Sequence, residues 1–346
     1  MGAVEVPEYE LPEEAIAQLP LEPRDSARLL DGTDPDGGLV HRYVKDLPEL
    51  VGEGDVLVVN TSRVVPARLR LFKTTGGAAE VLLLEPEGPD RRVWTALVRP
   101  GRRLPPGTVL SAAQGLPGVV EVGERLTEGQ RRVRFLADPV EVLANCGTVA
   151  LPPYIHAPLE DPCRYQTVYA DRPGSVAAPT AGLHLTEDVL ARCRAQGVQV
   201  HAVDLAVGIA TFKPVAVDRA EDHVMHQERY QVPADTWEAC RAARRVVAVG
   251  TTTVRALETA ASTGELEGFS DLFIRGDFPF AVVDVLLTNF HLPRSTLLLL
   301  LESFCGDRWR RMYETALGAG YRFLSFGDAM IVGRRSLPRA GGGQGA

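Results

Sequence analysis

Two histidines stand in short polar turns where a proton-transfer group could work. His184 closes the segment Pro179–His184, and His291 lies between an apolar run and a leucine-rich stretch. Imidazole titrates near neutral pH, so either ring suits a general acid or a general base. A lone histidine is nevertheless more often structural than catalytic. Thr180, in the first of these turns, is a further candidate for binding a substrate.

The stretch Thr288–Gly306 holds the densest group of polar candidates. The apolar run 280–287 predicts a buried strand that leads into it. Asn289 and Ser295 lie in the turn after that strand, and Ser295 or Thr296 can cap the helix that follows. Strand ends and free helix N–H groups converge at such turns in α/β proteins, which makes them common ligand sites. An ordinary strand–helix unit with a good cap has the same pattern.

A second polar turn, Gly250–Arg255, lies between a predicted strand and a predicted helix. Its backbone N–H groups, the hydroxyl of Thr252 and the guanidinium of Arg255 are suited to a carboxylate or a phosphate. The Gly-Lys-Ser/Thr spacing of a phosphate-binding loop is absent. A threonine-rich helix start is usually only a cap, so this turn carries little weight by itself.

Other candidates come from two motifs and one carboxylate. The motif His223–Glu228 contains two histidines, His223 and His226, and the carboxylate of Glu228 within six residues. Without a third defined ligand it does not predict a metal site, and we expect hydrogen bonding to a substrate or a structural role. Tyr165 and Gln166 offer an aromatic face and an amide to a base. Asp328 follows the last predicted strand.

The composition bounds the class of protein. The chain has 346 residues, of which 45% are hydrophobic and 24% charged, as in ordinary globular proteins of two domains. Its net charge of −8 does not point to nucleic acid, although a local basic face can still bind phosphates. Five widely spaced cysteines without a CxxC unit argue against zinc, iron–sulfur and disulfide frameworks and fit a reducing cytoplasm. We expect no membrane segment, because the start of the chain lacks an apolar signal and the five-leucine run is too short.

Alternating helix and strand patterns predict one α/β domain from residues 1–66 and 150–335. The expected strands are 55–60, 198–207, 246–249, 280–287 and 321–326, and the expected helices are 187–197, 234–245, 251–261 and 309–317. This order predicts a largely parallel sheet, open or closed. The first 50 residues are expected to be irregular. The tail 336–346 ends in a glycine-rich run and is expected to be disordered.

Residues 67–149 have a different pattern, with short apolar or alternating runs separated by Gly, Pro and Asp turns. Such closely spaced runs predict a small all-β barrel or sandwich, inserted into the α/β domain. Arginines are frequent in this segment: Arg91, Arg92, Arg99, Arg102, Arg103, Arg131, Arg132 and Arg134. They can protect exposed edge strands from aggregation, or they can form a surface for an RNA backbone.

Motifs along the whole chain carry a resemblance to one family. The stretch Thr-Asn-Phe-His-Leu-Pro-Arg-Ser-Thr-Leu at 288–297 and the stretch Val-Gly-Thr-Thr-Thr-Val-Arg-Ala-Leu-Glu at 249–258 are the most specific. The other matching segments are Pro20–Leu29, Val59–Arg68, Thr75–Leu84, Leu151–Ile155, Arg164–Ala170, Ala178–His184 and Tyr321–Met330. Taken in order from about residue 9 to 332, they resemble the S-adenosylmethionine:tRNA ribosyltransferase-isomerases of queuosine biosynthesis.

The resemblance implies a specific reaction. The ribosyl moiety of S-adenosylmethionine, a consumed co-substrate, is transferred to 7-aminomethyl-7-deazaguanine at the wobble position of tRNA and isomerised to give epoxyqueuosine, while adenine and methionine leave. The sulfonium acidifies the neighbouring ribose C5′, so a base is needed there and an acid should help adenine to depart. No metal is needed. The resemblance also implies a large α/β-barrel-like domain with a smaller inserted all-β barrel, acting as a cytoplasmic monomer.

The chain departs from the family pattern at several positions, including Ile274–Asp277, which replaces a Pro-Gly turn. Where the family typically has Leu-His-Val-Gly-x-Gly-Thr-Phe, this chain has alanine at Ala206 and at Ala210. Thr61 stands where the family usually has aspartate. An alanine cannot transfer a proton, so either another histidine takes that role or the reaction has changed.

The resemblance and the polar turns together predict the site residues. His184 and His291 are the expected proton-transfer groups. The residues expected to bind substrate are Tyr165, Gln166, Thr180, Gly208, Thr211, His226, Glu228, Thr252, Arg255, Asn289, Ser295 and Asp328. Two alternatives remain open, namely a paralogue that uses the same donor on a small-molecule acceptor, and a tRNA-binding homologue that has lost its activity.

Overall fold

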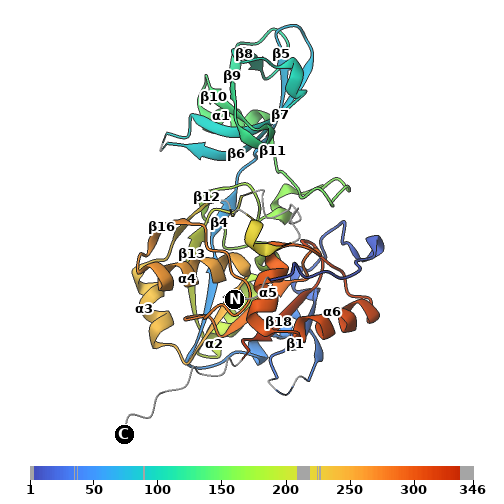
Figure 1. Ribbon diagram of the computed structural model, residues 1–346, viewed down its shortest axis with the longest axis vertical. Coiled ribbons are helices and arrows are strands. Elements are labelled where there is room, and N and C mark those ends of the chain that lie inside the picture. The colour runs from blue at the N-terminus through green and yellow to red at the C-terminus, as the bar shows by residue number, and fades with distance from the viewer. Residues whose placement is uncertain are drawn as a thin grey trace.

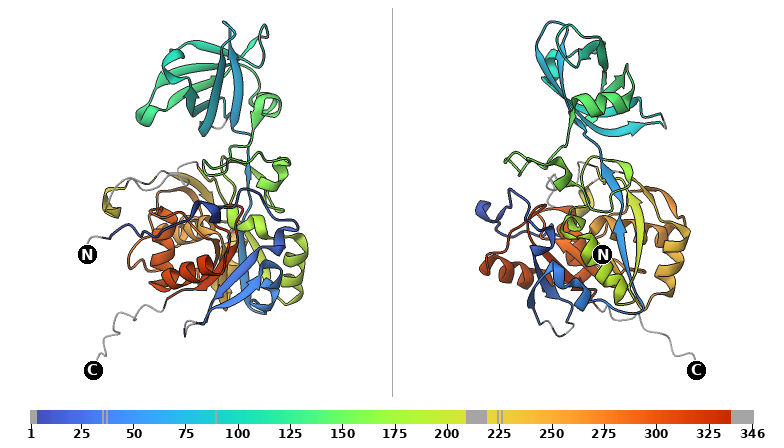
Figure 2. Two further views of the ribbon diagram at one scale, coloured as in Figure 1. Left: turned by 90° about the vertical axis from the view of Figure 1, so that its right-hand side faces the viewer. Right: turned by 180° about the vertical axis from the view of Figure 1, so that it is seen from behind.

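The computed structural model describes residues 4–335 except 35, 37, 89, 209–218, 224 and 226. Figure 1 shows a large α/β part with a small β barrel above it. The two views in Figure 2 show that a narrow connection joins the barrel to the rest. The predicted fold class, a large α/β part with a smaller all-β barrel, is confirmed. The expected disordered tail 336–346 lies outside the described residues.

A nine-stranded sheet forms the centre of the α/β part. In spatial order its strands are β16 (Glu267–Ser270), β14 (Glu228–Gln231), β13 (Gln199–Leu205), β3 (Asp55–Asn60), β15 (Arg245–Val249), β17 (Val285–Asn289), β18 (Ala329–Gly333), β1 (Arg28–Gly32) and β2 (Val40–Tyr43). Four of its pairings are parallel. The other four are antiparallel, so the expectation of a largely parallel sheet was wrong outside the central strands.

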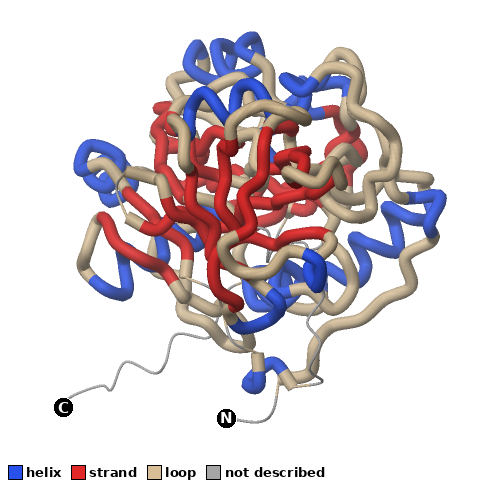
Figure 3. Tube along the Cα trace, turned by 90° about the horizontal axis from the view of Figure 1, so that it is seen from above, coloured by secondary structure: helices blue, strands red, loops and turns tan. Residues whose placement is uncertain are grey.

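The central strands are buried on both faces. Along β3, Val56 and Val58 pack into one apolar cluster, while Leu57 and Val59 pack into another on the opposite face. Successive side chains of a strand point to opposite faces, so a continuous apolar run can fill two layers. Figure 3, seen from above, shows helices surrounding these strands. The continuous apolar run at 55–60 therefore predicted this strand with its observed bounds.

The helices supply the two outer layers. They are α2 (Glu187–Ala195), α3 (Ala234–Ala242), α4 (Thr251–Thr263), α5 (Thr296–Cys305) and α6 (Arg308–Gly318). Residues of α4, α5 and α6 join the cluster that contains Val56, whereas those of α2 join the cluster that contains Leu57. Among the described helices, none is both long enough and apolar enough to cross a lipid bilayer.

The small barrel has its own sheet and its own core. Its strands are β11 (Gly147–Thr148), β5 (Arg68–Lys73), β6 (Ala78–Glu87), β7 (Val93–Arg99), β10 (Arg131–Phe135), β9 (Gly118–Arg125) and β8 (Thr108–Ser111), and a pairing between β5 and β8 closes it. Its interior is an apolar cluster around the buried Trp94. The helix α1 (Pro139–Cys146) precedes β11. A short parallel pair, β4 (Ser62–Val64) with β12 (Arg172–Ser175), lies where the chain passes between the two parts.

Two predictions from the sequence were wrong at the far edge of the large sheet. The segment 321–326 is a turn, and the last strand is β18, which begins at Ala329. Leu324 has a left-handed backbone with φ of 68°, and the N–H of Gly327 donates to its carbonyl, so the chain turns there. The first 50 residues, expected to be irregular, contribute β1 and β2.

A buried carboxylate fixes the loop that leads into β17. Glu258, on α4, is 1% exposed and accepts hydrogen bonds from the backbone N–H groups of Ala281, Val282 and Val283 at 2.8, 3.0 and 2.9 Å. Burial raises the pKa of this carboxyl, and the three N–H groups act in the opposite direction. The side chain thereby ties α4 to the segment before Asn289.

Replacing this carboxylate should destabilise the protein. In Glu258→Gln, an amide N–H group would face backbone N–H groups, leaving at least one buried donor unpaired. We expect the free energy of unfolding to fall by about 1–3 kcal/mol, measured by urea denaturation. The exposed Glu238→Gln on α3 is the matched control and should change it by less than about 0.5 kcal/mol. Equal stability of the two variants would contradict this role of Glu258.

Candidate active site

A polar pocket opens at the ends of β15 and β17, and we call it the strand-end pocket. Its volume is about 70 Å³. The pocket is lined by Tyr154, Ala178, Pro179, Thr180, Ala181, Val207, Gly250, Thr251, Thr252, Thr288, Asn289, Phe290, His291, Leu292, Ser295, Leu297, Leu324 and Ser325. It therefore brings together five of the predicted residues, namely Thr180, Thr252, Asn289, His291 and Ser295.

Two helices begin at this pocket. Ser295 caps α5 by accepting a hydrogen bond from the N–H of Leu298 at 3.2 Å. The turn before α4 requires glycine, because Gly250 has φ of 88°. No described side chain caps α4. The first N–H groups of a helix have no partner within the helix, so the start of α4 presents a positive partial charge to the pocket.

Asn289 has one unpaired atom in this setting. Its side-chain Nδ2 is 3.1 Å from the carbonyl of Leu324 and 2.8 Å from Nε2 of His184. A carbonyl can only accept, so Nδ2 is the amide nitrogen and its second N–H is donated to His184. The side chain is buried, and its Oδ1 has no hydrogen-bond partner among the described residues. A buried acceptor without a partner is rare and indicates a place for a ligand N–H group.

His184 does not line the strand-end pocket. It ends the 3-10 helix Thr180–His184 and lines a smaller cavity with Arg24, Arg164 and Arg322. Because Nε2 accepts from Asn289, the ring carries its proton on Nδ1 in the neutral form. Burial lowers the pKa of His184 to about 4. In this arrangement His184 orients the Asn289 amide.

His291 is held by its backbone and by its ring. Its N–H donates to the hydroxyl of Tyr313 at 2.8 Å, and its carbonyl accepts from the hydroxyl of Tyr9 at 2.5 Å. The ring Nε2 is 3.0 Å from Oγ1 of Thr288. Burial lowers the pKa of His291 to about 3. Both histidines are therefore neutral at pH 7.

A second pocket, which we call the interface pocket, lies between the barrel and the large sheet. Its volume is about 350 Å³, and it shares Val207 with the strand-end pocket. It is lined by Leu84, Glu85, Pro86, Gly88, Arg91, Gly174, Ala206, Val207, Gly208, Gln227, Glu228, Arg229 and Phe269. The predicted residues Gly208 and Glu228 belong to it.

Glu228 is the buried carboxylate of this interface pocket. Its Oε1 accepts from the N–H of Gly208 at 2.9 Å, and its Oε2 forms an ion pair with Arg255. Arg255 is itself buried, and its remaining donors face the carbonyls of Leu272 and Ser270. The predicted Arg255 thus neutralises Glu228 and does not line either pocket.

Three further predicted residues, Tyr165, Gln166 and Asp328, do not line either pocket. Tyr165 is fully buried, and its ring meets Phe326 at 5.9 Å. Gln166 uses both side-chain polar atoms on the backbone of Val64, at 3.0 and 2.8 Å. Asp328 accepts from the N–H groups of Arg28 and Arg322, at 2.8 Å each. Thr211 and His226 lie outside the described residues.

Tyr154 and Ser325 are among the pocket residues that were not predicted. The hydroxyl of Tyr154 is 2.7 Å from Oγ of Ser325, and both residues line the strand-end pocket. Burial raises the pKa of Tyr154 to about 12. Both residues stand within the segments Leu151–Ile155 and Tyr321–Met330 that carry the family resemblance, which is the signal that could have identified them.

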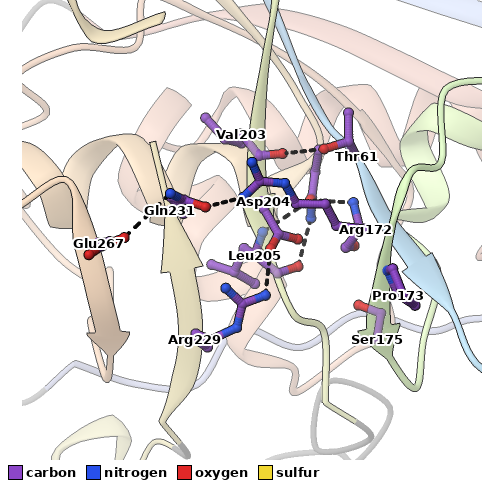
Figure 4. Close-up of polar contacts among 12 residues, drawn as sticks. Thr61, Arg172, Pro173, Ser175, Val203, Asp204, Leu205, Arg229, Gln231 and Glu267 are labelled. Carbon is purple, nitrogen blue, oxygen red and sulfur yellow. Dashed lines mark hydrogen bonds and ion pairs between the residues drawn. The ribbon is translucent and has the colours of Figure 1, made fainter. Parts of the chain in front are cut away.

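Two of the departures from the family pattern, Thr61 and Ala206, lie beside β13. Figure 4 shows that the hydroxyl of Thr61 reaches the carbonyl of Val203, at 3.1 Å. Ala206, one residue beyond β13, lines the interface pocket. Ala210 lies outside the described residues. Among the described residues, no group of three or more His, Cys, Asp or Glu side chains is placed to hold a metal ion.

Comparison with known proteins identifies the family to which this chain belongs. A sequence profile of the family described as "Queuosine biosynthesis protein" matches residues 5–332. A protein of Rubrobacter xylanophilus, named S-adenosylmethionine:tRNA ribosyltransferase-isomerase, is 50% identical over 333 residues, covering 95% of this chain and 98% of its own length. A protein of Thermus thermophilus with the same name is 49% identical over 350 residues, covering 96% and 100%. The crystal structure of the S-adenosylmethionine tRNA ribosyltransferase of Thermotoga maritima matches with a TM-score of 0.53 and 35% identity, over 94% of this chain and 99% of that chain.

The two buried histidines should make stability depend on pH. Their pKa values are about 4 and about 3 in the folded protein, against 6.5 for a free histidine. Below pH 6.5 the unfolded chain therefore binds protons that the folded protein does not, and stability falls as the pH falls. Between pH 7.5 and pH 5, each histidine should remove on the order of 2 kcal/mol from the free energy of unfolding.

This pH dependence can be measured by urea denaturation at pH 7.5 and pH 5. The His291→Gln variant keeps a hydrogen-bonding side chain, but this side chain cannot titrate. The free energy of unfolding of the variant should therefore fall by about 2 kcal/mol less than that of the wild type over this range. The exposed His156→Gln is the control and should keep the wild-type dependence. If the His291→Gln variant followed the wild-type curve, the buried neutral state of His291 would be wrong.

Proposed function

This chain belongs to the family of queuosine biosynthesis proteins, and we propose that it acts as a S-adenosylmethionine:tRNA ribosyltransferase-isomerase. In this reaction the ribosyl moiety of S-adenosylmethionine is transferred to 7-aminomethyl-7-deazaguanine at the tRNA wobble position and isomerised, which gives epoxyqueuosine-tRNA and releases adenine and methionine. The observation that carries the proposal is the 50% identity, over nearly the whole of both chains, to a relative of that name.

The strand-end pocket supports the donor side of the reaction. S-adenosylmethionine carries a carboxylate, and the uncapped start of α4 presents N–H groups at the pocket wall. Adenine carries an amino group that can donate to the unpaired Oδ1 of Asn289. We therefore propose that this pocket holds polar parts of the donor. We also expect the reaction to need no metal, because the donor carries its own leaving groups.

The roles of the two histidines follow from their neutral state. A general base works best when its pKa is near the working pH, and burial lowers the pKa of His184 to about 4 and that of His291 to about 3. His184 also has its basic nitrogen engaged by Asn289. We propose that His184 is a positioning residue for Asn289. Proton transfer by His291, predicted from the sequence, remains to be tested.

We also propose a division of the chain into two domains and a cellular setting. Residues 1–66 and 150–335 would form the catalytic domain, and residues 67–149 an inserted barrel, as their separate sheets and apolar clusters support. All five cysteines are free thiols, which fits a reducing cytoplasm. We expect the enzyme to act there as a monomer.

Release of adenine and methionine tests the function. The protein is incubated with S-adenosylmethionine, with and without tRNA that carries the 7-aminomethyl-7-deazaguanine. Release only with that tRNA is the expected result. Release that does not depend on tRNA would point to a small-molecule acceptor, the alternative that Ala206 and Thr61 suggest. Binding of tRNA without release would indicate a homologue that has lost its chemistry.

A double-mutant cycle tests whether His184 works through Asn289. Losing one hydrogen bond to the donor in Asn289→Ala should lower kcat/KM by about 5- to 150-fold, mainly by raising KM for S-adenosylmethionine. If His184 only orients that amide, His184→Ala should have a similar effect, and the double variant should be no worse than either single variant.

The control for this cycle is the exposed His156→Ala, which should keep wild-type kinetics. A double variant that is a further 10²- to 10⁴-fold slower than Asn289→Ala would show that His184 itself transfers a proton. Thermal unfolding of each variant separates a loss of activity from a loss of folded protein.

The barrel arginines provide a test of tRNA binding. Arg99, Arg102 and Arg103 are exposed at the end of β7 and in the turn after it. Changing all three to glutamate should weaken tRNA binding and reduce the slope of log K against log salt by up to about 2–3, because each phosphate contact contributes about 0.7–0.9.

The matched control changes Arg192, Arg194 and Arg241 to glutamate, which alters the net charge equally. These exposed residues lie on α2 and α3, and Figure 1 shows both helices far from the barrel. Their replacement should leave the salt slope near that of the wild type. If the two triple variants had equal salt slopes, the barrel arginines would be protecting edge strands and not binding RNA.

A further inference from the structure

The interface pocket is built by both parts of the molecule. The barrel contributes Glu85, Pro86 and Arg91, whereas the large sheet contributes Gly208 and Glu228. Its volume of about 350 Å³ lies within the range of pockets that bind small ligands or single groups of larger ones. The strand-end pocket, by contrast, is formed without residues of the barrel. The two pockets therefore differ in which part of the molecule a ligand must contact.

An exposed aromatic ring stands at the wall of the interface pocket. Phe269, on the edge strand β16, is 68% exposed, the highest value among the aromatic side chains described as exposed. Its neighbour Ser270 is fully buried, as the alternation of a strand requires. A single exposed phenylalanine is common on a protein surface, but this one also lines a pocket, where a ligand can cover its ring. Nucleobases are flat and stack on such rings regardless of their identity.

The charges around this ring suit a nucleotide. Arg91 donates from a guanidinium nitrogen to the carbonyl of Pro173 at 3.0 Å, which fixes this arginine between the barrel and the sheet. Arg229 is 44% exposed and pairs with Asp204 at 2.6 Å. Figure 4 shows these two side chains on neighbouring strands. Guanidinium groups at a pocket edge attract phosphates. Positive charge at the edge and an aromatic ring at the wall form the combination that single-stranded nucleic acid binds.

A carboxylate on the pocket wall adds base selectivity. Each oxygen of Glu228 receives one hydrogen bond, from Gly208 and from Arg255. A carboxylate can accept about four, so each oxygen retains capacity. A base of the guanine type presents an N–H and an amino group on one edge, which together match a carboxylate.

We propose that the interface pocket receives the acceptor nucleobase of the tRNA, unstacked from the anticodon, with one face of the base on Phe269. This inference rests on the proposed function. The aminomethyl group of the base then points across Val207, which both pockets share, toward the ribosyl group in the strand-end pocket. RNA recognition commonly uses loop bases that are turned out and stacked on aromatic side chains, and enzymes that modify a base must take it out of its stack.

The test compares Phe269→Ala, Phe269→Trp and Tyr43→Ala in steady-state kinetics. Tyr43 is the matched control, because it is 46% exposed on β2, the opposite edge of the same sheet. Phe269→Ala should raise KM for tRNA by about 5- to 150-fold and leave KM for S-adenosylmethionine unchanged. Phe269→Trp should keep near wild-type values, because an indole also stacks. Tyr43→Ala should change neither constant.

A binding experiment makes the result independent of catalysis. The Kd of an anticodon stem–loop RNA is measured by fluorescence anisotropy, and Phe269→Ala should weaken it by a similar factor. An unchanged Kd and KM for tRNA in Phe269→Ala would overturn the proposal, as would an equal rise in KM for S-adenosylmethionine. If the wild-type protein bound the stem–loop but released no adenine, the proposed function would fail while the nucleobase site could still be judged from the Kd values.

Discussion

A single buried amide at the end of β3 connects the parts of this molecule. Asn60 is fully buried, and its Oδ1 accepts from the N–H groups of Ser62 and Leu205, both at 3.1 Å. Its Nδ2 donates to the carbonyl of Leu205 at 3.0 Å and to Oγ1 of Thr252 at 3.2 Å. Every hydrogen-bonding group of this side chain is used, so no other side chain fits without leaving a buried group unpaired.

These hydrogen bonds are important because Asn60 lies where the large sheet, the barrel and the two pockets come close together. At this residue the chain leaves the large sheet for β4 and the barrel, while Leu205 ends β13 just before the interface pocket, and Thr252 lines the strand-end pocket. A shift of β3 by one residue would break all four bonds and exchange the side chains that pack into the two apolar clusters. The register of the sheet, the entry to the barrel and the geometry of both pockets are thus fixed at one point.

Continuous apolar runs and polar turns were the parts that the sequence predicted well. The run 55–60 became a strand with those bounds, because a strand that is buried on both faces needs apolar side chains at nearly every position. The alternating run 131–135 also became a strand with those bounds, with Val133 and Phe135 buried in the barrel and Arg134 exposed. The segment 321–326 also looks apolar, yet its aromatic rings fill the core beside Phe290 while its backbone turns. Five of the site residues in turns at strand ends lie together in the strand-end pocket, whereas His184 and Arg255, from the same turns, do not line it. Gln166 and Asp328 bind the backbone, because a sequence pattern does not reveal which partner a polar side chain will find.

The two pockets also differ in their relation to Ala206. Ala206 lines the interface pocket, whereas Asn289 and His291 line the strand-end pocket. Loss of an imidazole at this position therefore enlarges the space beside Glu228 and removes a titratable group there, without touching the residues around Asn289. Val207 is the one described residue that lines both pockets, so a change at position 206 acts first on whatever occupies the interface pocket. On the proposed assignment of the pockets, the departure from the family pattern bears first on how the acceptor is held, and the donor side retains the arrangement that its motifs specify.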